Sequence, residues 1–161
     1  MGTYLNPGND GFAYAVKTRY IDKTGLIDVV NGTIDTRRNL TCVSRPRCFG
    51  KSFAAQMLCA YYDRTVDSHG LFGKFNISKR TDYERHPNQY DVIYLDMTNI
   101  MGKASPEGFV SFLANAITRE LLVAYPDIRV GNALDETLVS AVEKNRQAFY
   151  HDHRRMGRAD S

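Results

Sequence analysis

One stretch, residues 39–62, constrains the fold of this chain more than any other. It consists of an apolar run over residues 40–43, a loop that contains Pro46 and Gly50, and a helical pattern that begins at Lys51. A strand, a loop and a helix in this order can bind an anion with backbone N–H groups and the helix N-terminus. The sequence therefore predicts a phosphate-binding loop over residues 44–50, which we call the phosphate loop.

Each side chain at the end of the phosphate loop has an expected task. Lys51 would reach the β- and γ-phosphates of a nucleotide, and the Ser52 hydroxyl would hold Mg²⁺. The spacing rule G-x-x-x-x-G-K-[ST] is broken at one place, where Arg45 replaces the first glycine. The alternative is an ordinary strand-to-helix turn with a solvated Lys51. A lysine in the first helical turn is unfavourable without an anion, which favours the nucleotide site.

The composition predicts a packed chain rather than a disordered one. Hydrophobic residues make up 43% of the 161 residues and charged residues 24%. The net charge of +3 neither demands nor excludes nucleic acid as a partner. No apolar stretch approaches the roughly 20 residues of a membrane span, and the N-terminus lacks the apolar run of a signal peptide. We therefore expect a cytoplasmic protein without a membrane partner. Cys42, Cys48 and Cys59 lack metal-ligand spacing, so we expect reduced thiols.

Three charged residues outside the phosphate loop could belong either to the site or to the scaffold. Asp96 follows an apolar run at residues 92–95, which predicts a buried parallel strand. Its carboxylate could hold Mg²⁺ through water, or it could cap the segment that follows, and we favour the cap. Asp22 and Lys23 could border the nucleotide or pair with each other at the surface, and we favour the surface pair.

The second half of the chain predicts two helices. Ser105 is typical of an N-cap, Pro106 of the first helical position, and apolar residues recur at helical spacing over residues 109–124. A further helix is expected to begin near Asn132 or Asp135. The polar segment between the two apolar runs, residues 63–89, predicts irregular structure with one short helix near residues 71–75.

Four blocks carry a family resemblance in the same order: LNPGNDGF at residues 5–12, YIDKTGLI at 20–27, SRPRCFGKSF at 44–53 and VIYLDM at 92–97. Together they resemble the AAA-ATPase-like proteins, bacterial P-loop proteins that often carry a PD-(D/E)XK nuclease-like domain. The family loop usually has the form RPRRFGKS, so the arginine at the first glycine position belongs to the pattern. Cys48 stands where the family generally has arginine. The resemblance implies an incomplete, AAA-like α/β P-loop fold with a parallel β-sheet flanked by helices.

The resemblance also implies a ligand set. ATP and Mg²⁺ are the expected cofactors, with Ser52 as the metal-binding position. Asp96 is a second metal candidate on its residue pattern alone, because the resemblance makes residues 92–95 the second core strand and places the Walker B strand later in the chain. The expected nucleotide contacts are Arg45, Arg47, Phe49, Gly50, Lys51 and Ser52. For the two arginines, a solvated position in the loop is an equal alternative. Besides nucleotide, the expected partners include another copy of the chain, and nucleic acid through a nuclease-like domain that this chain lacks.

The family's Walker B strand, an apolar run ending in Asp-Glu, is missing where the resemblance expects it. After Val142 the chain continues instead with NRQAFYHDHRRMGRADS at residues 145–161, which is basic and holds no apolar strand. Codons can be chosen for this tail so that reading one base later gives TGKRFIMIIDEWDAPI. We therefore expect residues 1–144 to be the N-terminal part of an AAA-ATPase-like domain. Residues 145–161 are expected to be a non-native basic tail, produced by a frameshift that truncates the protein. The alternative is a disordered basic tail.

Loss of the Walker B strand would impair hydrolysis, because P-loop enzymes need a carboxylate for Mg²⁺ and a group that orients water. We therefore expect an ATP-binding domain and leave enzymatic activity open. In the strand order 5-1-4-3-2 that the resemblance implies, the two apolar runs are not neighbours and would expose apolar faces. One alternative is a nucleic-acid-binding or regulatory module that uses Arg37, Arg38, Arg45, Arg47 and the tail arginines. Another is an inert gene fragment.

Overall fold

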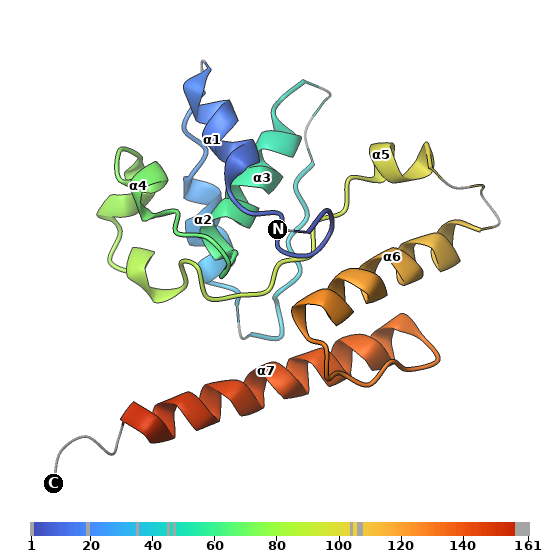
Figure 1. Cartoon of the computed structure of the whole chain (residues 1–161). Coiled ribbons are helices and arrows are strands. Elements are labelled where there is room, and N and C mark those ends of the chain that lie inside the picture. Colours follow the sequence, from blue (N-terminus) through green and yellow to red (C-terminus); the bar gives the residue numbers. More distant parts are fainter. Residues whose placement is uncertain are drawn as a thin grey trace, which may run out of the picture. The chain divides into compact units, whose positions relative to one another are not determined.

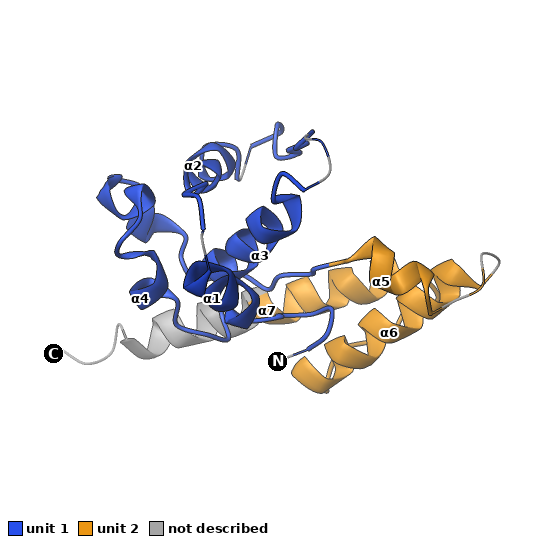
Figure 2. Cartoon of the chain, turned by 90° about the horizontal axis from the view of Figure 1, so that it is seen from above, with its two compact units in different colours: residues 1–94 blue, residues 95–161 orange. Residues whose placement is uncertain are grey.

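Helices and their connecting loops make up the structure, a computed structural model, over the residues that it describes. These are residues 2–18, 20–34, 36–44, 46, 48–103, 105 and 108–156, with side chains described up to residue 145. The chain divides into two units, residues 1–94 and 95–161, which are coloured separately in Figure 2.

The predicted α/β fold with a parallel sheet is wrong. The described residues are mainly helical and contain no sheet, only two isolated bridges, Leu5 with Ile93 and Asp63 with Tyr90. Residues 40–43 lie outside any strand, and the Leu40 side chain is 94% exposed. An apolar run becomes a strand only where a neighbouring strand accepts its backbone hydrogen bonds. Neither run finds such a parallel neighbour among the described residues.

The run at residues 92–95 instead joins the N-terminal segment. Asn6 N–H donates to the Val92 carbonyl at 2.8 Å, and Tyr94 N–H donates to the Tyr4 carbonyl at 2.8 Å. The Asn6 side chain closes the pairing, because its oxygen accepts from Val92 N–H at 2.8 Å and its amide donates to Asp91 at 2.9 Å. The bridge is antiparallel and too short to form a sheet. The turn-rich N-terminus is thus an ordered loop.

The first unit holds four α-helices and two short 3₁₀ helices among its described residues (Figure 1). They are α1 (Asp10–Lys17), α2 (Gly25–Asn31), α3 (Lys51–Tyr62), α4 (His69–Phe72), η1 (Asn76–Lys79) and η2 (Tyr83–Arg85). Helices α1 and α3 lie side by side, and α3 also contacts α2. Helix α3 therefore forms the centre of this unit.

An aromatic cluster fills the space around α3. The Phe12 ring of α1 stacks on Phe72 of α4 with ring centroids 5.0 Å apart. Tyr61 of α3 meets the same Phe72 edge-on at 5.7 Å, and all three rings are buried. Aromatic pairs in these geometries add to the free energy of burial, by about 0.5–1.5 kcal/mol each. Apolar residues of the segment predicted to be irregular, Ile77 and Tyr83 among them, complete the core.

Polar groups inside this core differ in how well they are satisfied. The Tyr61 hydroxyl donates to the Tyr83 carbonyl at 2.7 Å and accepts from the Asn31 amide at 3.1 Å. The Tyr62 hydroxyl donates to the Asn31 side-chain oxygen at 2.6 Å. The Tyr83 hydroxyl is buried without a hydrogen-bond partner among the described residues, and burial raises the pKa of Tyr83 to about 12.

The second unit is built around a helical hairpin. Its helices are α5 (Met97–Met101), α6 (Phe109–Ala124) and α7 (Leu134–Met156). Helices α6 and α7 pack against each other (Figure 1), with Ile117, Leu121 and Ala141 buried. Helix α6 confirms the strongest helical pattern of the sequence. Its N-cap is Gly108, whose N–H lies 3.1 Å from the Ser105 carbonyl, so the helix begins later than the Ser105 signal predicted.

Side chains of α7 hold the loop that precedes it. Gly131 N–H donates to the Thr137 hydroxyl at 3.0 Å, and Asn132 N–H donates to the Glu136 carboxylate at 2.8 Å. Helix α7 begins at Leu134, between the two predicted positions, Asn132 and Asp135. Its backbone is helical across residues 144 and 145, where the sequence predicts the start of a non-native tail. That boundary stays a prediction.

Two tyrosines of the first unit provide a matched test of this polar core. Replacing Tyr61 by Phe removes both hydrogen bonds of its hydroxyl and leaves buried partners unsatisfied, so we expect a loss of about 1–3 kcal/mol in the free energy of unfolding. Replacing Tyr83 by Phe removes a buried hydroxyl that has no partner among the described residues. We expect this change to be neutral or stabilising by up to about 1 kcal/mol. Urea titrations of both variants measure the difference, and equal losses would contradict this description of the core.

Candidate functional site

The phosphate loop ends in a left-handed turn at the start of α3. Gly50 is the N-cap residue of α3, with φ of 73° and ψ of 30°. Cys48, two residues earlier, also has a positive φ of 67°. Glycine adopts this conformation at little cost, and other residues do not. The left-handed backbone at residue 50 therefore explains why a glycine precedes Lys51. The N–H groups of the first turn of α3 follow directly.

Lys51 folds back over the phosphate loop. Its ammonium group donates to the Pro46 carbonyl at 2.9 Å, and the residue is exposed. Ser52 follows in the first turn of α3 and is also exposed. Phe49 lies at the surface of the loop, with 59% of its side chain exposed. Four of the predicted site residues, Phe49 to Ser52, are thus consecutive and accessible at the N-terminus of α3.

A second lysine reaches the same turn from another segment. The Lys23 ammonium donates to the Phe49 carbonyl. It also lies 2.7 Å from the position that a Cβ atom at Gly50 would occupy. The surface pair predicted for Asp22 and Lys23 is therefore wrong, because Lys23 borders the phosphate loop. The alternative weighed for Asp22 and Lys23, a position beside the nucleotide, stays a prediction.

Asp22 fixes the turn from which Lys23 extends. Its carboxylate accepts hydrogen bonds from Thr24 N–H at 2.9 Å, from the Thr24 hydroxyl at 2.6 Å and from Asn76 N–H at 3.1 Å. Partial burial by itself raises the pKa of Asp22, but the hydrogen bonds from Thr24 and Asn76 outweigh this effect and lower the pKa below its ordinary value. Asp22 is thus a scaffold residue.

The remaining predicted residues fall into two groups. Arg45 and Arg47 lie outside the described residues. Asp96 belongs to the second unit and is the N-cap of α5, where its carboxylate accepts from Thr98 N–H at 3.0 Å and from the Asn99 amide at 3.0 Å. The favoured capping role of Asp96 is confirmed.

The described residues suit a phosphate group better than a metal ion. Backbone N–H groups at a helix N-terminus and two ammonium groups are donors from which a phosphate anion can accept hydrogen bonds. Mg²⁺ requires several oxygen ligands, usually with at least one carboxylate. No group of three or more His, Cys, Asp or Glu side chains with metal-binding geometry occurs in the described part of the chain. If Mg²⁺ accompanied the phosphate, Ser52 would offer its hydroxyl, with phosphate oxygens and water as further ligands.

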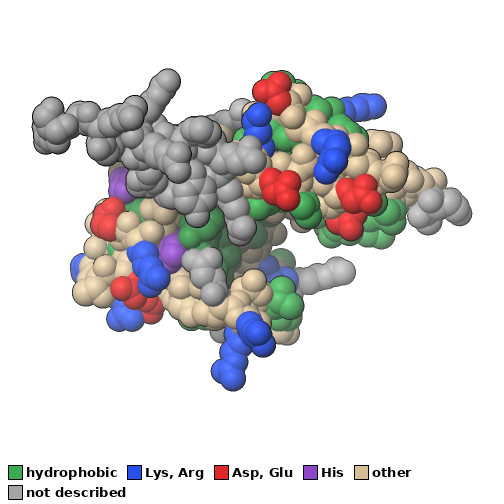
Figure 3. Space-filling view, turned by 90° about the horizontal axis from the view of Figure 1, so that it is seen from below, with side chains coloured by type: hydrophobic (Ala, Val, Ile, Leu, Met, Phe, Trp, Pro, Cys, Tyr) green, Lys and Arg blue, Asp and Glu red, His purple; other side chains and the backbone are tan. Residues whose placement is uncertain are grey.

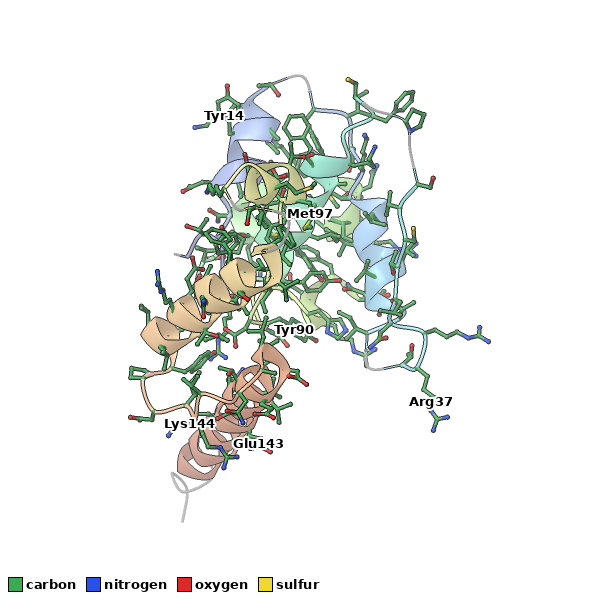
Figure 4. All side chains as sticks on the ribbon, turned by 90° about the vertical axis from the view of Figure 1, so that its right-hand side faces the viewer. Tyr14, Arg37, Tyr90, Met97, Glu143 and Lys144 are labelled. Atoms are coloured by element: carbon green, nitrogen blue, oxygen red, sulfur yellow. The ribbon has the colours of Figure 1, made fainter. Side chains whose placement is uncertain are left out.

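Basic side chains elsewhere are dispersed or paired. Arg80 forms an ion pair with Asp28 at 2.7 Å, and Arg64 lies 3.4 Å from Asp91. Arg37 projects outward from the segment after α2 (Figure 4). On the face seen in Figure 3, lysine and arginine side chains are scattered among acidic ones rather than gathered into a stripe. Arg45, Arg47 and the arginine side chains of the tail, on which the basic-module alternative depends, lie outside the residues that this view describes, so that alternative stays open.

For Lys23 the sequence allows two positions, at the surface or beside the nucleotide, and favours the surface. Its contact with Phe49 spans 26 positions in sequence, and no local pattern reports such a contact. The available signal was its place in the block YIDKTGLI, which is one of the four blocks of the family resemblance.

Comparisons with known proteins give one positive finding. A family model described as "Predicted AAA-ATPase" matches residues 14–152 of the chain. No curated protein and no solved structure matches. Among the described residues, no helix has both the length and the apolar character needed to cross a membrane.

Two glycines that adjoin helix starts provide a matched pair for testing the turn. We expect replacement of Gly50 by Ala to cost at least about 1–2 kcal/mol, because alanine is strained at positive φ and its Cβ would displace the Lys23 ammonium. Gly25 begins α2, and no atom lies within 4 Å of the place that a Cβ at this residue would occupy, so Ala should be neutral or stabilising by up to about 1 kcal/mol. Thermal unfolding of both variants measures the difference, and an unaffected Gly50 variant would refute the left-handed turn.

Proposed function

This chain belongs to the AAA-ATPase-like family, and from that premise we propose that its phosphate loop binds the phosphates of ATP. The observation that carries the proposal is the left-handed Gly50 at the N-terminus of α3, with the Lys51 ammonium beside the loop. A helix N-terminus preceded by such a turn is suited to an anion. The family match supports a nucleotide as the source of that anion.

Each residue of the site has a proposed role. Lys51 exchanges the Pro46 carbonyl for the β- and γ-phosphates, and Gly50 lets the backbone approach them closely. Ser52 offers its hydroxyl to the Mg²⁺ that accompanies ATP. Bound Mg²⁺ would neutralise part of the phosphate charge. Arg45, Arg47 and Phe49 are proposed to contact the nucleotide from the loop.

Binding is proposed here with little or no hydrolysis. Hydrolysis of ATP needs a carboxylate that helps to hold Mg²⁺ and a second group that orients the attacking water. Asp96, the candidate carboxylate, is already engaged as the N-cap of α5. We therefore propose that this chain binds nucleotide as an ATP-binding module of the cytoplasm. As partners beyond nucleotide we propose a second copy of the chain, and nucleic acid through a nuclease-like domain, both on the family resemblance alone.

A nucleotide-binding experiment tests the proposal directly. We expect MgATP to raise the melting temperature of the 161-residue chain by several degrees, since ligand at 100 times its Kd stabilises by about 2.7 kcal/mol. Replacing Lys51 by Gln should abolish most of this shift. Replacing Lys17 by Gln, at the exposed end of α1, is the matched control and should leave the shift unchanged.

Two results would contradict the proposal. One is the absence of any shift with MgATP in a chain that unfolds cooperatively. The other is stabilisation that is equal for MgATP and for duplex DNA and that disappears steeply with salt, which would instead favour the basic-module alternative.

The gene sequence tests the separate proposal that residues 145–161 arise from a frameshift. We expect the reading frame one base later to encode an apolar run ending in Asp-Glu and to continue open downstream. Sequencing the gene from codon 140 onward measures this. A shifted frame that meets stop codons at once would show that the tail belongs to the protein, and the frameshift proposal would then be abandoned.

A further inference from the structure

Two ammonium groups from separate segments converge on carbonyl oxygens of the phosphate loop. Lys51, the first residue of α3, donates to Pro46. Lys23, which precedes α2, donates to Phe49. The Lys23 contact is the closer to the helix, because Phe49 immediately precedes the N-cap residue Gly50. The turn at the start of α3 is therefore bordered by two cations.

The backbone of Lys23 is held firmly in place. Its N–H donates to the Tyr20 hydroxyl at 3.3 Å, and its carbonyl accepts from Leu26 N–H at 3.0 Å. The next residue, Thr24, is fully buried and bonded twice to the Asp22 carboxylate. A side chain that extends from such an anchored backbone loses little further freedom when it binds a ligand. Lys23 is preorganised toward the loop.

The electrostatic setting of Lys23 is incomplete without an anion. The N-terminus of a helix carries a partial positive charge, so a neighbouring ammonium group is repelled by it. An ammonium group has three donors, and a neutral carbonyl offsets its charge only in part. Lys51 adds a second positive charge to the same turn. A phosphate oxygen in reach of both lysines would replace this repulsion by attraction between the anion and the two ammonium groups.

We propose that Lys23 is a second phosphate-contacting lysine, whose Nζ passes from the Phe49 carbonyl to a phosphate oxygen when ATP binds beside Lys51. This inference rests on the proposed function of the phosphate loop and extends it to a residue that the glycine-lysine-serine motif does not contain. Gly50 takes part by leaving open the space that the Lys23 ammonium occupies.

A positioning role is the competing explanation. In that case Lys23 holds the Phe49 carbonyl, shapes the loop for Lys51 and never contacts phosphate. The two roles differ in a double-mutant cycle. A residue that positions only Lys51 has no further effect once Lys51 is gone, and a residue that positions the backbone N–H groups of the loop is distinguished by the acetylation measurement described below. A residue that contacts phosphate itself weakens binding by its own factor in either background.

The experiment measures the Kd of MgATP and of inorganic tripolyphosphate by calorimetry for the wild type, Lys23→Gln, Lys51→Gln and the double variant. We expect about a tenfold loss of affinity for each single change and about a hundredfold loss for the double change, as charge-assisted hydrogen bonds of ordinary strength would give. Lys23→Arg should retain most of the affinity. The Lys17→Gln variant is the control, and circular dichroism establishes that each variant is folded.

A measurement on the wild type tests the proposal without depending on the folding of any variant. Acetylation by a lysine-specific reagent, read residue by residue by mass spectrometry, should slow at Lys23 and Lys51 when tripolyphosphate is added, and stay unchanged at Lys17. Unchanged acetylation of Lys23 beside a protected Lys51 would overturn the proposal.

The possible outcomes distinguish a failure of the proposed ATP binding from a failure of the role proposed for Lys23. If the wild type binds neither probe, the proposed function and this inference both fall. If Lys51→Gln weakens binding and Lys23→Gln does not, only this inference falls. It also falls if the double variant binds as well as Lys51→Gln alone, since Lys23 would then act only by positioning the loop.

Discussion

A buried carboxylate at the end of α3 ties together the parts of the first unit. Asp63 is fully buried and accepts hydrogen bonds from Gly8 N–H at 2.6 Å, from Thr65 N–H at 2.8 Å and from the Thr65 hydroxyl at 2.7 Å. A negative charge at a helix C-terminus is unfavourable, and its burial is costly, unless several donors compensate it. These bonds join the N-terminal loop, α3 and the chain that follows, so α3 and the phosphate loop at its other end are held in place.

The elements that were predicted correctly have local causes. Helix α3 begins at Lys51 because Gly50 supplies the left-handed turn before it, and α6 follows a run of apolar residues at helical spacing. Asp96 caps the next helix because an aspartate side chain can accept from N–H groups two and three residues later. In each case the signal and its structural effect lie within a few residues of each other.

The errors concern structure that depends on distant partners. Apolar runs at residues 40–43 and 92–95 suggested strands, but a strand forms only where another strand meets it, and the sequence does not say which one does. Val92 and Tyr94 form backbone hydrogen bonds with the N-terminal loop, and Leu40 is exposed. For Lys23 the less favoured of two alternatives agrees better with the structure, because its contact with the phosphate loop is formed by tertiary packing that the sequence does not report.

The placement of Lys23 and Lys51 departs from what stability alone would select. Surface lysines are ordinarily stable near helix C-termini, where the dipole attracts them, yet here both lie at the N-terminal end of α3. The surrounding structure holds them there, through the hydrogen bonds of Asp22 with Thr24 and through the turn at Gly50. A local conflict that is maintained by well-formed structure marks a functional site more often than a packing defect. An anion at this turn would convert the repulsion between the two ammonium groups and the helix N-terminus into attraction, and this physical argument is the basis of the proposed phosphate binding.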